Sequence, residues 1–189
     1  MSAPHYAKDV YGLLPMEQML DYSGLDFMKG ILNGDLPAPP IAQTLNFRLK
    51  EVVDGKVVFT GAPQFASLNP MGTVHGGWYG TVLDSAMSCA VMTKVPRGSF
   101  YTTLEFKVNI VRSIPVDRVV DVIGTVDHAG RSTGISHGQI IDVETGQLYA
   151  TGSTTCIIIK AKSHPLTCSS SRTQLLDHVR GPHHRSMRG

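Results

Sequence analysis

The longest apolar stretch of the chain predicts one buried helix. Trp78–Thr93 contains no proline, and Asp84 is its only charged residue. Asn69-Pro70 and Gly72 mark a loop before it, and His75-Gly76-Gly77 stands where the helix should begin. A helix that is apolar on nearly all sides is normally enclosed by other elements. The pattern therefore predicts a central helix with a polar interruption at Asp84.

Alternating apolar and polar residues predict strands on both sides of this helix. Tyr101–Arg112 alternates with period two, and Asp54-Gly55 is a strong hairpin signal between two further strands. The order of two strands, one helix and four strands predicts an α+β fold whose antiparallel sheet wraps around the helix. Such a sheet has open edges, so we expect pairing with a second copy. The other predicted strands are Asn46–Val53, Lys56–Gly61, Arg118–His128, Ser132–Val143 and Gln147–Ile159.

The first 40 residues predict a helical arm that packs over the sheet. Pro15–Leu20 and Ser23–Leu32 are short helix candidates, and Asn33-Gly34 ends the second. Pro37–Pro40 favours an extended linker. We expect three parts: an N-terminal helical arm and linker at residues 1–40, the main domain at 41–162, and a basic, solvated tail at 163–189.

Composition narrows the class of protein. A length of 189 residues with 42% hydrophobic residues suits one domain with a substantial core. No apolar run approaches the roughly 20 residues of a membrane span, and the N-terminus lacks a secretory signal pattern, so we expect a cytoplasmic protein. Three cysteines without CxxC spacing favour neither a zinc site nor a disulfide framework, and we expect no metal and no cofactor. The net charge of +2, concentrated in the tail, gives no sign of nucleic-acid binding.

Asp84 and the glycines at the helix start are the candidate chemistry. A carboxylate on a buried helix must be paired, hydrogen-bonded or left with a raised pKa, which makes it a candidate general base or nucleophile. The first N–H groups of a helix have no partner within the helix, and Gly76-Gly77 lets a substrate approach them closely enough to stabilise an oxyanion. A purely structural role stays open for both features. Asp84 could accept hydrogen bonds at a packing face, and the glycines could provide the positive φ that a turn needs.

These residues carry a resemblance to a known family. Asn69, His75-Gly76-Gly77 and Asp84, followed by the strand Tyr101–Arg112, resemble the hotdog-fold thioesterases, and within them the PaaI-like group associated with phenylacetic acid degradation. The similarity extends over residues 20 to 160 and includes Leu36–Ile41, Gly130-Arg131 and Gly146–Ala150. It implies the hotdog fold, in which an antiparallel sheet wraps one long central helix.

The resemblance implies a role for each motif residue. Asp84 is then the catalytic carboxylate, as general base or nucleophile, and the Gly76 backbone N–H is the oxyanion donor. Asn69 binds the carbonyl or positions the water, His75 supports the motif, and Thr103 orients the water. The candidate substrate-binding residues are Gly77, Trp78, Arg112 and Arg131.

The resemblance also implies an assembly and a substrate class. The expected function is hydrolysis of aromatic (phenylacetyl-like) or medium-chain acyl-CoA to free acid and CoA. The expected assembly is a homodimer with its sheets joined edge to edge, or a dimer-of-dimers homotetramer, with Asp84 and Thr103 from one subunit and Asn69 and Gly76 from the other. One departure is Arg112-Ser113-Ile114-Pro115 in place of an Arg-Pro pair. It leaves open whether Arg112 reaches the CoA phosphates.

Two other functions are alternatives. A non-catalytic acyl-thioester-binding protein could keep the fold, because fold does not fix function. A hotdog hydratase acting on enoyl-CoA would pair an aspartate with a catalytic histidine on a loop after the helix start, whereas here His75 precedes Asp84. The intact set of Asn69, Gly76, Asp84 and Thr103 favours the hydrolase over the binding protein, and the position of His75 favours it over the hydratase.

Overall fold

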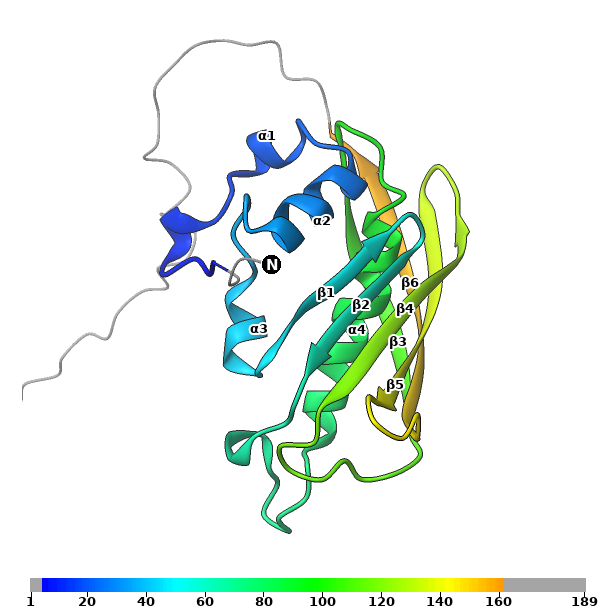
Figure 1. Ribbon diagram of the computed structural model, residues 1–189. Coiled ribbons are helices and arrows are strands. Elements are labelled where there is room, and N and C mark those ends of the chain that lie inside the picture. Colours follow the sequence, from blue (N-terminus) through cyan, green and yellow to red (C-terminus); the bar gives the residue numbers. More distant parts are fainter. Residues whose placement is uncertain (1–4, 162–189) are drawn as a thin grey trace, which may run out of the picture.

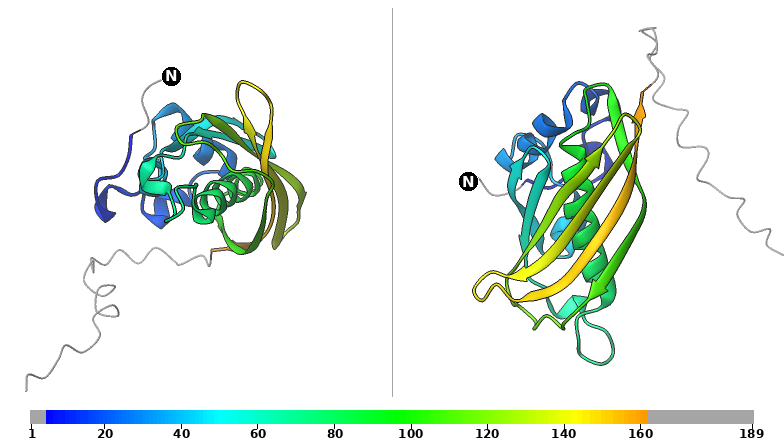
Figure 2. Two further views of the ribbon diagram at one scale, coloured as in Figure 1. Left: turned by 90° about the horizontal axis from the view of Figure 1, so that it is seen from below. Right: turned by 90° about the vertical axis from the view of Figure 1, so that its right-hand side faces the viewer.

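One long helix forms the centre of the protein. The computed structural model describes residues 5–161, so the expected tail at 163–189 lies outside the described residues. Helix α4 (Gly76–Met92) runs along the concave side of a six-stranded antiparallel sheet, which curls around it (Figure 1). The view along the helix in Figure 2 shows the sheet enclosing it on one side. The predicted α+β architecture is therefore confirmed.

The strand order leaves two edges of the sheet open to other contacts. The order across the sheet is β1-β2-β4-β5-β6-β3, so β3 lies beside the last strand and forms one edge, while β1 forms the other. Asp54-Gly55 closes the predicted hairpin, with Gly55 at a φ of 81°. The strands are β1 (Phe47–Val53), β2 (Lys56–Gly61), β3 (Ser99–Ile110), β4 (Val120–Ala129), β5 (Thr133–Asp142) and β6 (Leu148–Lys160).

Three short helices precede β1: α1 (Met16–Met19) and α2 (Gly24–Asn33) in the N-terminal arm, and α3 (Pro40–Thr44) after it. Helix α2 matches the prediction, with the Ser23 side chain capping its start and Gly34 in the left-handed conformation ending it. The predicted extended linker is correct only as far as Pro39. Pro40 begins α3 instead, because proline fixes φ near the helical value and has no N–H to lose in the first turn. Two 3-10 turns, Val10–Gly12 and Phe65–Ser67, complete the helical elements.

The arm is fixed to the far end of α4. Gly24 at the start of α2 donates its backbone N–H to the Val95 carbonyl at 2.9 Å. The two backbones approach so closely that a Cβ on Gly24 would lie 1.7 Å from the Met92 carbonyl oxygen. Only glycine fits there. The arm therefore meets the main domain in a defined position.

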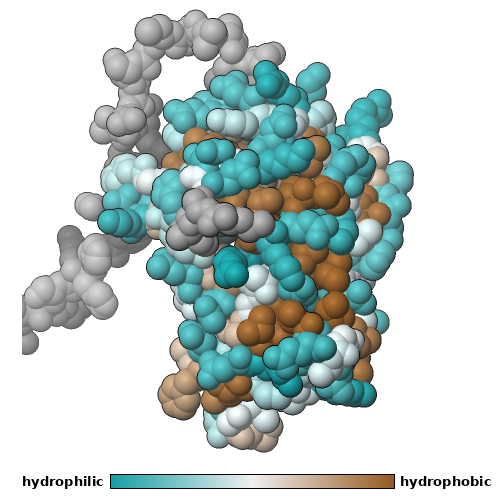
Figure 3. All heavy atoms as spheres, in the orientation of Figure 1, coloured by the Kyte–Doolittle hydropathy of each residue, from teal (hydrophilic) through white to brown (hydrophobic). Residues whose placement is uncertain are grey.

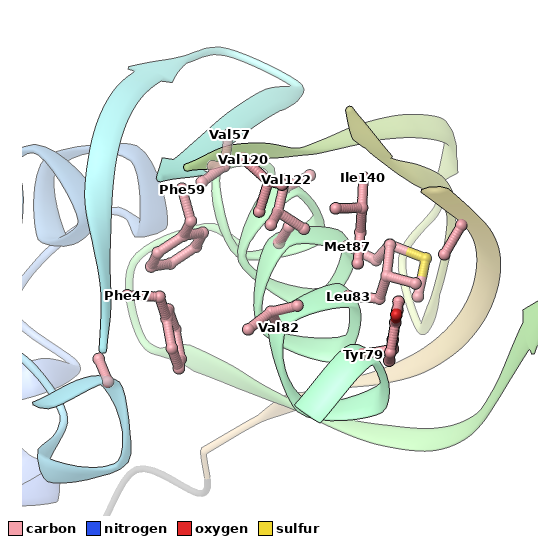
Figure 4. Packing of buried hydrophobic residues seen from close by; sticks show 14 of the residues in the cluster. Phe47, Val57, Phe59, Tyr79, Val82, Leu83, Met87, Val120, Val122 and Ile140 are labelled. Atoms are coloured by element: carbon pink, nitrogen blue, oxygen red, sulfur yellow. The ribbon is translucent and has the colours of Figure 1, made fainter. Parts of the chain in front are cut away.

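The core fills the space between α4 and the sheet. Val82, Leu83 and Met87 of α4 are fully buried and face side chains from the neighbouring strands, among them Val122 and Ile140 (Figure 4). Hydrophilic residues cover most of the face seen in Figure 3, and apolar residues form separate patches among them. Within residues 5–161, no helix is long and apolar enough to cross a membrane.

Candidate active site

The start of α4 presents one backbone N–H that has no acceptor. His75 is the N-cap, and its Nδ1 accepts a hydrogen bond from the Gly77 N–H at 2.8 Å. The Trp78 N–H bonds to the His75 carbonyl. The Gly76 N–H makes no hydrogen bond with any residue between 5 and 161, and Gly76 is exposed. At a helix N-terminus such a group carries partial positive charge and can receive an anion.

The loop before α4 is held by Asn69. Its Oδ1 accepts from the backbone N–H groups of Met71 (2.9 Å) and Thr73 (3.2 Å), and its Nδ2 donates to Thr73 Oγ1 at 2.8 Å. The His75 N–H donates to the Ser67 carbonyl, which ties the loop back to the preceding turn. A side-chain amide has two N–H donors and Thr73 uses one. In this chain Asn69 therefore shapes the loop that leads to Gly76.

Asp84 forms the second part of the site, together with Thr103. Thr103 Oγ1 donates a hydrogen bond to Asp84 Oδ1 at 3.0 Å, across the space between α4 and β3. Both side chains are half-buried. Burial raises the pKa of Asp84, and the hydrogen bond from Thr103 partly offsets this by favouring the charged form. Asp84 is thus a partly desolvated carboxylate with a hydroxyl beside it, which suits a base that accepts a proton from water.

The groups around Asp84 are neutral. Burial raises the pKa of the Cys89 thiol to about 12 and also raises the pKa of Cys156, so neither is a thiolate near neutral pH. Tyr101 donates to Ser88 Oγ at 3.3 Å, and burial raises the pKa of its hydroxyl. Tyr101 is not among the predicted site residues. The sequence signal that could have placed Tyr101 near Asp84 is its position two residues before Thr103, which puts both side chains on the same face of β3.

An exposed seam connects the two parts. Small residues of α4 lie beside apolar side chains of β3: a Cβ on Gly76 would meet Ile110 at 3.7 Å, and one on Gly80 would meet Phe106 at 3.5 Å. Gly76 and Asp84 are eight residues apart in the same helix, a rise of about 12 Å. A single carbonyl carbon cannot touch both groups across that distance.

The predicted substrate-binding residues lie in three different environments. Gly77 is exposed, but His75 already occupies its N–H. Trp78 is only 3% exposed and its indole N–H donates to the Leu45 carbonyl at 3.0 Å, so the ring is part of the core and only borders a small cavity of about 300 Å³ beside the helix start. A role for Trp78 in substrate binding stays a prediction.

The two arginines lie at opposite ends of the domain. Arg112 follows β3 and is exposed close to the start of α4, since Tyr79 Oη donates to its carbonyl at 3.3 Å and accepts from the Ile114 N–H at 2.8 Å. Buried Ile114 thus anchors the segment that departs from the Arg-Pro pattern. Arg131 lies exposed in the turn between β4 and β5, near the end of α4 that carries Val91. Within one chain, Arg131 does not reach the Gly76 loop.

Metal ligands are not assembled in this part of the chain. Across residues 5–161, no three side chains of histidine, cysteine, aspartate or glutamate gather in a group that could hold a metal ion. The site as described consists of a carboxylate, a hydroxyl and a helix N-terminus. This set can activate water and stabilise an oxyanion.

Comparisons with known proteins agree with this description. Residues 71–149 match the thioesterase superfamily. No curated protein matches the chain by sequence. A phenylacetic acid degradation-related protein from Ralstonia eutropha, described as a thioesterase, shares 26% identity with a TM-score of 0.63, covering 69% of this chain and 98% of its own. A hypothetical thioesterase from Streptococcus pneumoniae, solved with coenzyme A, shares 27% identity with a TM-score of 0.56 over 62% of this chain and 89% of its own.

A third structure extends the likeness in fold. The PaaI protein of the phenylacetic acid degradation operon of E. coli has 17% identity and a TM-score of 0.61, covering 75% of this chain and 97% of its own. At this identity the similarity concerns the fold. The resemblance read from the Asn69, His75-Gly76-Gly77 and Asp84 motif is therefore confirmed at the level of the family. Residues 71–149 thus match the thioesterase superfamily, and the chain has the hotdog fold seen in the PaaI-like structures that it resembles.

Proposed function

We propose that this protein is an acyl-CoA thioesterase that hydrolyses aromatic or medium-chain acyl-CoA and acts as a homodimer with shared active sites. The observation that carries the proposal is the Asp84–Thr103 pair, a half-buried carboxylate with a raised pKa and a hydroxyl 3.0 Å away. The free N–H of Gly76 supplies the second requirement of the reaction, a donor for the oxyanion. The Streptococcus pneumoniae structure with coenzyme A supports CoA as the carrier.

The reaction needs one proton acceptor and one oxyanion donor. Asp84 accepts a proton from a water molecule that Thr103 helps to orient, while the water oxygen bonds to the thioester carbonyl carbon. The carbonyl oxygen becomes an oxyanion at the Gly76 N–H. The carbon–sulfur bond then breaks, the free acid forms, and the CoA thiolate takes up the proton held by Asp84. Thiolate is a good leaving group because a thiol is much more acidic than an alcohol; a free cysteine side chain, for example, has a pKa of about 8.5.

A nucleophilic route uses the same residues. Asp84 would attack the carbonyl carbon, the carbon–sulfur bond would break with release of CoA thiolate, and an anhydride would form. Water would then hydrolyse the anhydride to the free acid and the Asp84 carboxylate, and the released proton would pass to the thiolate. Both routes place the oxyanion at the Gly76 N–H. They differ in whether a solvent oxygen enters the product directly or first enters Asp84, which single-turnover hydrolysis in ¹⁸O-water distinguishes.

The second subunit completes the site. About 12 Å separates Gly76 from Asp84 along α4, which favours the Gly76 N–H of a second chain as the donor that serves Asp84. Edge strand β3 offers the surface for this pairing, with Leu104 61%, Phe106 46% and Ile110 50% exposed. An open strand edge that carries exposed apolar side chains is prone to pair with another strand. Joining two β3 edges would bring the Gly76 loop of one chain toward Asp84 of the other.

Thiol release from a panel of acyl-CoAs tests the proposal. Wild type and Asp84→Asn are compared on phenylacetyl-, benzoyl-, hexanoyl- and crotonyl-CoA, with a thiol reagent as the readout. We expect turnover that falls by about 10²–10⁴ in the variant, because the proton acceptor is lost while the shape is kept. Tight binding of acyl-CoA by a folded dimer without thiol release would refute hydrolysis and favour a binding protein. Loss of the enoyl absorbance of crotonyl-CoA without thiol release would indicate a hydratase.

A further inference from the structure

An apolar cavity lies between the N-terminal arm and the main domain. Its volume is about 460 Å³, and none of its lining residues is charged. Phe27 and Ile31 of α2 form the arm side of the wall, and Leu49 of β1 forms part of the other side. Cavities that hold small molecules typically measure about 300–1,000 Å³ and are mostly apolar. The cavity therefore has the size and lining of a site for an apolar group.

The inner end of this cavity reaches the surroundings of Asp84. Cys89 and Tyr101 line it. Tyr101 bonds to Ser88, and Ser88 lies one helical turn beyond Asp84 on the same face of α4. On the strand side, Thr103 follows Tyr101 by two residues and points to the same side of β3. An acyl group whose carbonyl lies at Asp84 can thus extend toward the C-terminal end of α4 and enter the cavity.

We propose that this cavity receives the acyl chain of the thioester, and that the N-terminal arm thereby sets the chain length the enzyme accepts. The inference rests on the proposed thioesterase function. The arm residues that line the cavity lie outside residues 71–149, the part of the chain that matches the thioesterase superfamily. The proposed specificity element therefore lies outside the segment that matches the thioesterase superfamily.

The wall of the cavity is held in place by backbone contacts. The Gly24 N–H bonds to the Val95 carbonyl, and the Gly98 N–H bonds to the Leu20 carbonyl at 2.9 Å. These bonds fix both ends of the Leu20–Gly24 segment, from which α2 and its residues Phe27 and Ile31 project. A fixed wall limits how far a chain can extend. The cavity should therefore limit the length of the acyl chain, in addition to favouring apolar groups.

Straight-chain acyl-CoAs from acetyl to dodecanoyl test the assignment in the full-length protein. Each methylene that enters the cavity should raise kcat/KM about fourfold, until the cavity is full and the increase stops. Ile31→Trp places a bulky ring in the cavity. If it removes room for two methylenes, kcat/KM for octanoyl-CoA falls about 16-fold, while acetyl-CoA changes less than about twofold because a two-carbon chain does not reach the arm.

Lys29→Trp is the matched control, because Lys29 lies on the same helix but is exposed and does not line the cavity. It should leave the chain-length profile unchanged. Ile31→Ala is a second variant, which enlarges the cavity and should move the longest efficiently hydrolysed chain upward. This variant keeps the proposal testable if the tryptophan variant does not fold.

The outcomes separate this inference from the proposed function. Hydrolysis with the same chain-length profile in wild type, Ile31→Trp and Ile31→Ala would overturn the cavity assignment and leave the thioesterase standing. Hydrolysis of no acyl-CoA would overturn the thioesterase, and calorimetry with octanoate then tests the cavity alone. Octanoate binding that Ile31→Trp abolishes and Lys29→Trp keeps supports the apolar site, whereas binding that is absent or unaffected by Ile31→Trp refutes it.

Discussion

Two inactive variants should restore each other if the active site is shared between chains. In Asp84→Asn homodimers both sites lack the proton acceptor, and in Gly76→Pro homodimers both lack the oxyanion donor. A heterodimer of the two has one site with both groups intact and one site with neither. Because about 12 Å of helix separates the groups within a chain, the intact site forms only across the interface.

The structure indicates that Gly76→Pro will fold. Gly76 is the first residue of α4, its N–H is not hydrogen-bonded to residues 5–161, and proline is favoured at that position. His75 has a φ of −65° and a ψ of 138°, the extended conformation that a residue before proline adopts. Gly76→Ala is the matched control, since it keeps the N–H and its Cβ would meet only Ile110 at 3.7 Å.

The expected rates follow from the chemistry of each loss. Removing the oxyanion donor should lower kcat by about 10²–10³ in Gly76→Pro, whereas Gly76→Ala should stay within a few-fold of wild type. The heterodimer, co-expressed with two affinity tags and purified through both, should show about half the wild-type rate per dimer, since one site of two is intact. A heterodimer no faster than its two parents, with unchanged thermal unfolding, would refute the shared site.

Two further predictions concern the pH dependence and the dimer edge. Because Asp84 must be charged to accept a proton and burial raises its pKa, kcat/KM should fall as the pH drops through that raised value. Thr103→Val removes the hydrogen bond that lowers this pKa, so the acidic limb of the pH profile, where kcat/KM falls, should move to higher pH. Thr103→Ser keeps the hydroxyl and should leave the acidic limb in place. An acidic limb at the same pH in the valine variant would show that Asp84 is not the titrating group. Leu104→Lys places a charge on the exposed β3 edge, where it should convert the dimer to a folded monomer and lower the rate by about 10²-fold or more, measured by light scattering and thiol release. A fully active dimer of this variant would mean that β3 is not the interface.

The candidate site was visible in the sequence only in part. Asp84 is conspicuous because it interrupts an apolar helix, and Gly76-Gly77 because a helix start has free N–H groups. Thr103 has no such local signal, since it lies 19 residues away on another element and meets Asp84 only when β3 folds beside α4. Trp78 shows the opposite case: a large aromatic side chain next to the motif belongs to the core, because its N–H bonds to the Leu45 carbonyl.

The alternation of apolar and polar residues, the Asp54-Gly55 turn and the apolar run after Gly77 determined the elements and their order, because each depends on neighbours within a few residues. The tertiary structure decided how closely α4 and the sheet approach: a Cβ on Gly124 would lie 2.1 Å from the Ala86 carbonyl oxygen, a constraint between residues 38 positions apart that no local pattern encodes. It also placed β3 at an open edge and the arm over a cavity. These features depend on contacts between distant segments, and they determine which residues can act together.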